Sequence, residues 1–179
     1  MIKKLSKKAS LLSALVLTMA LFAGCSNEKE NQKVADIEVK TIATKELQDK
    51  LSDDSWVVVD TRINDAFNGW KLDEVERGGH IKGAVDFSAN WLTVDSKDKE
   101  KTLDKALETK GIEKDKNIVL YDANGKDAKE VANYLSEKGY KNLYTYNVAD
   151  WAKDESLPME SYENYEMIVP ATIVNDILD

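Results

Sequence analysis

The chain has 179 residues, of which 33 are acidic and 25 are basic, so its net charge is −8. Nucleic acid is disfavoured as a partner, because binding to phosphates depends on clustered Lys and Arg. A single cysteine excludes an intramolecular disulfide, and the folded part must be stabilised by its hydrophobic core.

The first 25 residues have the pattern of an export signal. Four lysines precede an uncharged, mostly apolar run at 11–23, which is too short to span a bilayer. Small residues and then Cys25 follow, as in the lipobox of bacterial lipoproteins, although Phe22 stands where leucine is commonest. We therefore predict a lipoprotein signal peptide at 1–25, lipid on Cys25 and anchoring to the outer face of a bacterial cell membrane. An ordinary signal peptide and an uncleaved anchor are the alternatives.

Residues 26–36 are polar and charged without apolar periodicity, which is typical of a flexible tether. Without the four leader lysines, 21 basic and 33 acidic residues remain, and the net charge becomes −12. Such a surface is not attracted to anionic lipid headgroups. Lipid on Cys25, and not charge, would hold the protein at the membrane.

From residue 37 on, short apolar runs alternate with helical periodicity, which predicts one α/β domain at 37–160 with a central parallel sheet. Five strands are expected, at 37–39, 56–59, 84–87, 118–121 and 142–146. Helices are expected after an N-cap at Thr44, at 65–70, around Leu103 and Leu107, and from Asp127 on. Gly111 and Gly139 are expected to end the two longer helices.

The stretch 117–134 predicts a functional site. A buried strand is followed by a polar loop and then by a helix with an apolar stripe at Ala128, Val131, Ala132 and Leu135. Open α/β sheets bind ligands at the carboxyl ends of their strands, next to helix N-termini. The site-like loop is Asp122-Ala123-Asn124-Gly125-Lys126-Asp127, with a carboxylate where a nucleophile would be expected. Amides of the loop can hold that carboxylate by hydrogen bonds.

The C-terminal tail has its own pattern. Residues 168–177 match 42–51 at three apolar positions, and Pro170 stands where Thr44 begins a helix. We therefore predict that 161–179 is a linker with the start of a truncated second copy of the domain. A C-terminal helix packed on the first domain is the alternative.

Several short motifs, in their order and spacing, resemble those of the rhodanese-like domains of the sulfurtransferase family. The motifs are Val58-Val59-Asp60-Thr61-Arg62, Phe67-Asn68-Gly69-Trp70, Arg77-Gly78-Gly79-His80-Ile81-Lys82-Gly83-Ala84, the strand from Ile118 to Asp122, and the stretch from Leu143 through Trp151 to Leu157-Pro158. This resemblance implies an α/β fold with a central parallel sheet. It also implies that active members transfer sulfane sulfur, from a donor such as thiosulfate, through a persulfide on a cysteine at the position of Asp122.

Asp122 departs from that pattern, because a carboxylate cannot form a persulfide. In tandem members of the family, the N-terminal copy typically carries aspartate at this place and is inactive. The chain therefore resembles the structural N-terminal half of a tandem thiosulfate or 3-mercaptopyruvate sulfurtransferase. We expect no catalytic residue, no metal and no cofactor in it. Its expected partners are the membrane and a catalytic rhodanese domain in tandem.

Two other classes of function remain as alternatives. The chain is either a stand-alone module that binds a protein partner or a small cation, or an enzyme that transfers a phosphoryl group through Asp122. The second is disfavoured because Asn124 stands where a second acid is usual. His80 is interpreted as a turn-stabilising residue, and Asp60 with Arg62 as a structural ion pair or a strand-end cap.

Overall fold

The computed structural model describes residues 38–170. The predicted signal peptide with Cys25, the tether and the tail at 171–179 lie outside the described residues. The described residues belong to one compact unit. None of its helices is long and apolar enough to cross a membrane.

A five-stranded parallel sheet forms the centre of the domain, in the strand order β1-β6-β5-β2-β4. The strands are β1 (Lys40–Thr41), β2 (Trp56–Asp60), β4 (Val85–Asp86), β5 (Asn117–Asp122) and β6 (Leu143–Asn147). Side chains of β5 alternate between the two faces and are buried on both, as the continuous apolar run predicts. The predicted fold class, α/β with five parallel strands, is confirmed.

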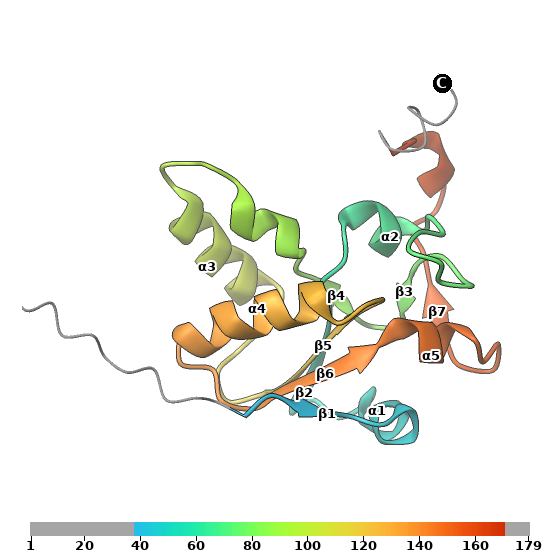
Figure 1. Ribbon diagram of the computed structural model, residues 1–179, viewed down its shortest axis with the longest axis horizontal. Helices are drawn as coiled ribbons and strands as arrows, with labels where there is room; N and C mark the ends of the chain where they lie inside the picture. The colour runs from blue at the N-terminus through green and yellow to red at the C-terminus, as the bar shows by residue number, and fades with distance from the viewer. Residues whose placement is uncertain (1–37, 171–179) are drawn as a thin grey trace, which may run out of the picture. The chain divides into compact units, whose positions relative to one another are not determined.

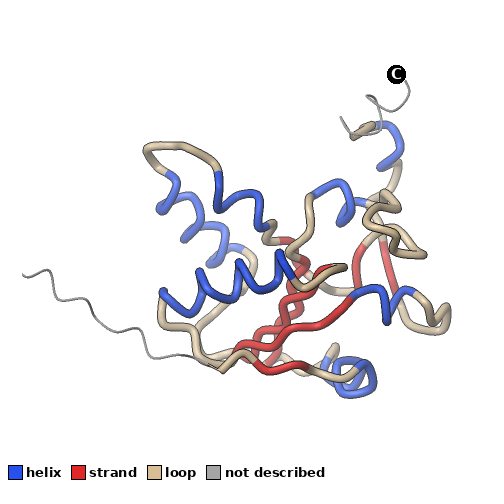
Figure 2. The backbone as a smooth tube through the Cα atoms, in the orientation of Figure 1, coloured by secondary structure: helices blue, strands red, loops and turns tan. Residues whose placement is uncertain are grey.

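Helices cover both faces of this sheet (Figures 1 and 2). One face packs against α3 (Lys99–Thr109), α4 (Lys126–Glu137) and the short helix η1 (Ala89–Thr93). The other packs against α1 (Thr44–Lys50) and α5 (Val148–Ala152). All four members of the apolar stripe predicted on α4 are fully buried. Hydrophobic burial on both faces is therefore the main stabilising term.

The two long helices end in the same way. Gly111 and Gly139 have φ angles of 66° and 87°, and they follow α3 and α4 as C-terminal caps. The next amides, of Ile112 and Tyr140, donate back to carbonyls five residues earlier, at 3.0 and 3.1 Å. Both predicted helix ends are confirmed, because only glycine adopts this left-handed conformation at no steric cost.

A second, two-stranded sheet was not predicted. It consists of β3 (His80–Ile81) and β7 (Met159–Glu160), which pair antiparallel beside α2 (Asn64–Asn68). The following chain, with the short helix η2 (Tyr165–Met167), returns to α2, because the Tyr162 amide donates to the Asn68 carbonyl at 2.8 Å. Neither strand lies in an apolar run of its own, in contrast to the equally short β4, so neither could be expected.

Several predicted boundaries are wrong in detail, and those of β2, β4, β5 and β6 differ from the expected ranges by one residue at one or both ends. The edge strand β1 lies at 40–41 and not at 37–39, and it is followed directly by the buried Ile42, whose amide donates to the Thr145 carbonyl of β6 at 3.2 Å. The N-cap of α1 is Ala43, and Thr44 instead shares a hydrogen bond of 2.8 Å with the Tyr146 hydroxyl. The helix expected at 65–70 spans 64–68 and ends before Gly69, whose φ is 154°.

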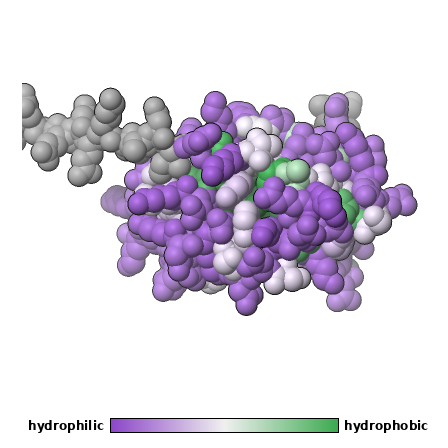
Figure 3. Space-filling view, turned by 90° about the horizontal axis from the view of Figure 1, so that it is seen from below, coloured by the Kyte–Doolittle hydropathy of each residue, from purple (hydrophilic) through white to green (hydrophobic). Residues whose placement is uncertain are grey.

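Charged and polar side chains dominate the face of the molecule that Figure 3 shows, with small groups of hydrophobic ones between them. This agrees with a charged fraction of 32% in the sequence. Trp151 is fully buried, Trp56 and Trp91 lie half-buried against the cores, and Trp70 is half-buried beside Tyr165. The tryptophans are therefore packing residues or boundary residues, as expected.

Candidate functional site

The predicted loop lies at the carboxyl end of β5, with Asp122 as the last residue of the strand. Gly125 has a φ of 78° and precedes the first residue of α4, Lys126. The helix thus begins one residue earlier than predicted. Glycine suits this position because the left-handed turn aims the following amides back toward the end of the strand.

Those amides hold the carboxylate of Asp122. The Gly125 amide donates to Oδ1 at 2.6 Å, and the Ala128 amide donates to Oδ2 at 3.0 Å. The residue is only 1% exposed. The predicted amide cradle is confirmed, with a negative charge at the positive end of the α4 dipole. Sequence reasoning placed Ala128 only in the apolar stripe, although its amide also serves the site.

The other loop residues differ in exposure. Ala123 is half-buried against the core beneath the sheet, and Asn124 and Lys126 are exposed. The Asn124 side chain accepts a hydrogen bond of 3.0 Å from the Lys126 amide, which closes the turn. Asp127 is half-buried, and burial followed by the nearby Asp122 charge raises the pKa of its carboxyl group above 3.8.

A second buried carboxylate, Asp60, lies at the end of the neighbouring strand β2. Its oxygens accept hydrogen bonds from Arg62 Nε at 3.0 Å, Arg62 Nη2 at 2.6 Å and the Arg62 amide at 3.0 Å. The guanidinium also donates to the Gly79 carbonyl at 2.7 Å. Both side chains are at most 1% exposed. The predicted structural ion pair is confirmed.

Tyr121 links these strand ends. Its carbonyl accepts from the Thr61 hydroxyl at 2.9 Å, and its own hydroxyl accepts from the Ile81 amide at 3.1 Å. Complete burial raises the pKa of the Tyr121 phenol well above its ordinary value. The phenol is therefore neutral, and Tyr121 has the structural role of joining its own strand, β5, to β2 and β3.

His80 lies in strand β3 and not in a turn. Its Nδ1 is 2.8 Å from the Phe67 carbonyl oxygen, and its ring stacks on Phe67 with the centroids 3.8 Å apart. Its Nε2 is 3.6 Å from a carboxylate oxygen of Glu160 on β7. These contacts join α2 to the small sheet, which gives His80 a structural role of another kind than predicted.

The chemistry open to these residues is limited. Cys25 is the only cysteine of the chain, so residues 38–170 contain no thiol. Within the described part of the chain, no group of three or more His, Cys, Asp or Glu side chains is placed to hold a metal ion. The loop presents the buried carboxylate of Asp122, which accepts hydrogen bonds from two main-chain amides, and the exposed polar residues Asn124 and Lys126 surround it.

Comparison with known proteins places this architecture in a family. Residues 43–152 match the rhodanese-like domain. Similar solved structures include wild-type EanB, and a single-substitution variant of EanB with ergothioneine covalently linked to a persulfide cysteine. The anaerobic ergothioneine biosynthesis enzyme from Chlorobium limicola, in complex with trimethyl histidine, is also similar.

Each of these three structures has 31% sequence identity and a TM-score of 0.71. The matches cover 79% of this chain but only 32% of the other chains. The chain thus spans about a third of the length of the proteins it resembles. Because the domain match covers more than half of its residues, the chain belongs to the rhodanese-like domain family, which relates it to enzymes of the sulfurtransferase type.

Proposed function

We propose that this protein is a membrane-anchored rhodanese-like domain that does not transfer sulfur by itself. One observation carries the proposal, namely that the amides of Gly125 and Ala128 hold the carboxylate of Asp122 at the end of β5. Catalytic members of the family are expected to have a cysteine at this position. The loop keeps the form of a sulfurtransferase site but holds a carboxylate in place of the nucleophile.

The chemistry explains why this exchange matters. Sulfur transfer from thiosulfate needs a thiolate that attacks the sulfane sulfur, so that a new S–S bond forms and sulfite leaves with the electron pair. A carboxylate forms no stable bond of this kind. EanB, which is similar in fold and 31% identical, has been captured with a persulfide cysteine. That comparison supports cysteine as the group that this loop lacks.

The proposed role is that of a structural N-terminal half, which works beside a catalytic rhodanese-like domain in tandem. The aspartate at 122 and the similarity of 168–177 to 42–51 support this role. The leader, with its lysines, apolar run and Cys25, supports export and lipid anchoring. A protein anchored in this way would present the domain outside the membrane.

Thiosulfate-to-cyanide sulfur transfer tests the central claim. The chain from Ser26 to Asp179, which contains no thiol, should produce no thiocyanate above the buffer rate. Asp122→Cys in the same chain should gain activity, because the Gly125 and Ala128 amides can stabilise a persulfide anion. Asp122→Ser is the matched control and should stay inactive. Thiocyanate production by the unsubstituted chain would overturn the proposal.

Anchoring and the tandem role have separate tests. The full chain, expressed in a bacterium, should fractionate with the membrane, and Cys25→Ser should release it into the soluble fraction. Equal membrane retention of both forms would contradict lipid anchoring. Sequencing of the gene beyond the codon for Asp179 tests the tandem role. A second rhodanese-like domain with a cysteine at its strand end is expected there, and unrelated sequence would remove this part of the proposal.

A further inference from the structure

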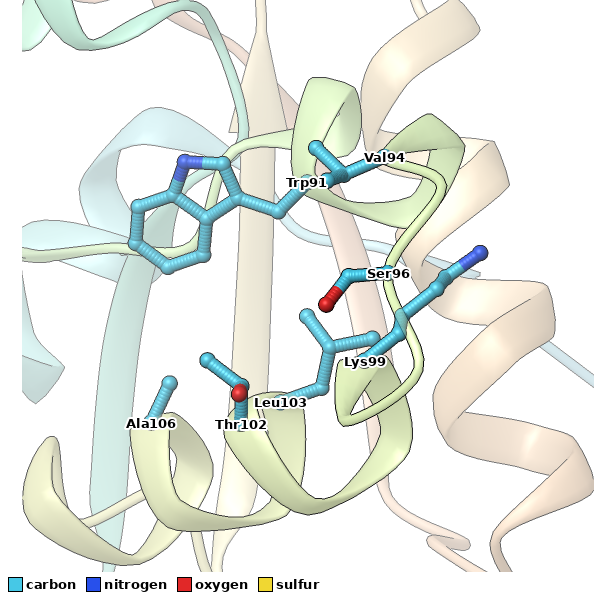
Figure 4. A pocket seen from close by; sticks show the side chains of 7 residues that line it. All are labelled: Trp91, Val94, Ser96, Lys99, Thr102, Leu103 and Ala106. Atoms are coloured by element: carbon cyan, nitrogen blue, oxygen red, sulfur yellow. The ribbon is translucent and has the colours of Figure 1, made fainter.

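A pocket of about 400 Å³ lies between α3 and the chain around η1, and none of its lining residues belongs to the Asp122 loop. Its walls are apolar, with the Trp91 indole opposite Leu103 and Ala106 on α3, as Figure 4 shows. Val94 stands at the mouth and is 53% exposed. A volume of this order suits a small organic molecule.

The indole wall is held in place from behind. Trp91 Nε1 donates to Asn64 Oδ1 at 3.1 Å, and Phe87 packs edge-to-face on the ring with the centroids 5.4 Å apart. The indole N–H of Trp91 thus already has a hydrogen-bond acceptor. Because the Trp91 side chain is already fixed, little conformational entropy is lost when an apolar ligand packs against it.

Polar groups gather on one side of the pocket. The Ser96 hydroxyl points into it in Figure 4, and Thr102 lines it from α3. Lys99 is its one charged lining residue and donates a hydrogen bond to the Leu92 carbonyl. An ammonium group carries three donors, so two remain. In Figure 4 the ammonium group of Lys99 points away from Trp91 and Ala106, so it can meet only the end of a ligand farthest from the indole.

The neighbouring surface of α3 adds positive charge. A second hollow shares Thr102 with the pocket and is lined by Lys101, Lys105 and Asp98. Two carboxylates of α3, Glu100 and Asp104, bind Lys138 on the side of α4, at 3.1 and 2.6 Å. The third, Glu108, lines a different hollow, beside Ile112. Lysine therefore predominates on the side that faces the two hollows, although the chain as a whole is acidic.

From this juxtaposition we infer that the pocket binds a small amphiphilic anion, with its apolar body against Trp91 and Ala106 and its acidic head toward Lys99, Lys101 and Lys105. An apolar chain or ring loses water contact in the slot. The carboxylate or sulfonate head stays at the mouth among lysine ammonium groups. This site is separate from the Asp122 loop and does not depend on the proposed function.

Octanoate and 1-octanol are matched probes, since they share an apolar chain and differ in the charged head. The chain from Ser26 to Asp179, which contains both cores, is titrated with each and followed by amide chemical shifts. Octanoate should bind about fivefold more tightly than octanol and shift amides around Trp91 and Ala106. Equal affinity of the two probes, or no shift in this region, would overturn the inference.

Variants identify the two parts of the site. Ala106→Trp fills the slot and should weaken both probes about tenfold. Lys101→Glu with Lys105→Glu should weaken octanoate about fivefold and change octanol less than about twofold. Lys141→Glu, an exposed charge reversal elsewhere, is the control and should change neither.

Thermal unfolding monitors the fold of each variant. Should Ala106→Trp fail to fold, Val94→Asp serves instead, because Val94 is exposed and a carboxylate at the mouth should repel octanoate. Unchanged octanoate binding in folded Ala106→Trp, or in Val94→Asp where it replaces that variant, would show that the ligand does not use this pocket. Unchanged octanoate binding in Lys101→Glu with Lys105→Glu would show the same.

Discussion

Two carboxylates at the ends of adjacent strands are buried to nearly the same extent but are stabilised by different means. Asp60 at the end of β2 is 0% exposed and binds the guanidinium of Arg62. Asp122 at the end of β5 is 1% exposed and binds two main-chain amides. The first depends on another charged side chain, with one main-chain amide beside it, whereas the second depends on main-chain amides alone and so on the path of the backbone.

This difference explains why only one of the two positions is suited to carry chemistry. Removing Arg62 would leave a buried charge without a partner, so the Asp60 pair is fixed by stability. The amides around Asp122 belong to a loop and helix that the rest of the fold positions. Another acceptor or anion at 122, including a thiolate, can use the same amides, so function can change there with the fold intact.

The largest expected effect is that of Arg62→Met. It leaves the Asp60 charge buried and unpaired, and should lower the free energy of unfolding by about 3–5 kcal/mol in urea titrations. Lys153→Met breaks an exposed pair with Asp150 and should cost less than about 1 kcal/mol. Asp60→Leu with Arg62→Met removes both charges and should cost less than Arg62→Met alone. An Arg62→Met cost as small as the Lys153→Met control would refute the account of the buried pair.

A smaller loss is expected for Asp122→Ala. The Gly125 and Ala128 amides lose their acceptor, which should cost about 2 kcal/mol of unfolding free energy. Asp122→Asn keeps one acceptor oxygen and should cost about half as much. Amide hydrogen exchange gives the local measure, because both amides should exchange faster in the alanine variant. If only distant amides changed their exchange, the cradle would not be what stabilises the loop.

The smallest effect concerns Asp127. Burial and the Asp122 charge raise the pKa of its carboxyl group above 3.8, and this pKa should fall in Asp122→Asn. Because the folded value is raised, the stability that protonation of Asp127 contributes is full below 3.8 and is lost as pH rises through the folded pKa. The chemical shift of the Asp127 carboxyl carbon, followed against pH, measures this pKa in the unsubstituted chain and in Asp122→Asn. A midpoint that stays the same in the variant would exclude Asp122 as a cause.

Much of the architecture could be predicted because its signals are local. β-Branched runs predict β2 and β5, and the spacing of Ala128, Val131 and Leu135 predicts the buried face of α4. Gly111 and Gly139 mark helix ends because their conformation is costly for other residues. The Asp122 loop followed from the order of strand, turn and helix.

Contacts between distant parts of the chain could not be predicted in the same way. The Arg77 guanidinium donates to four carbonyls at 2.8–2.9 Å, and all belong to residues 74 to 80 positions later, in or just after α5. No periodicity marks an arginine for such a role. The pairing of β3 with β7 and the pocket beside Trp91 also arise only when separate segments are brought together.

The position of β1 has a mechanical consequence. β1 is a two-residue edge strand that pairs only with β6, and the Thr44–Tyr146 hydrogen bond nearby joins residues 102 positions apart. β1 is synthesised first among the strands, and it therefore cannot pair until β6, near the end of the described chain, has been synthesised. A pull applied through the residues before Glu38 would peel β1 from the rim first, while the other four strands of the sheet stay paired.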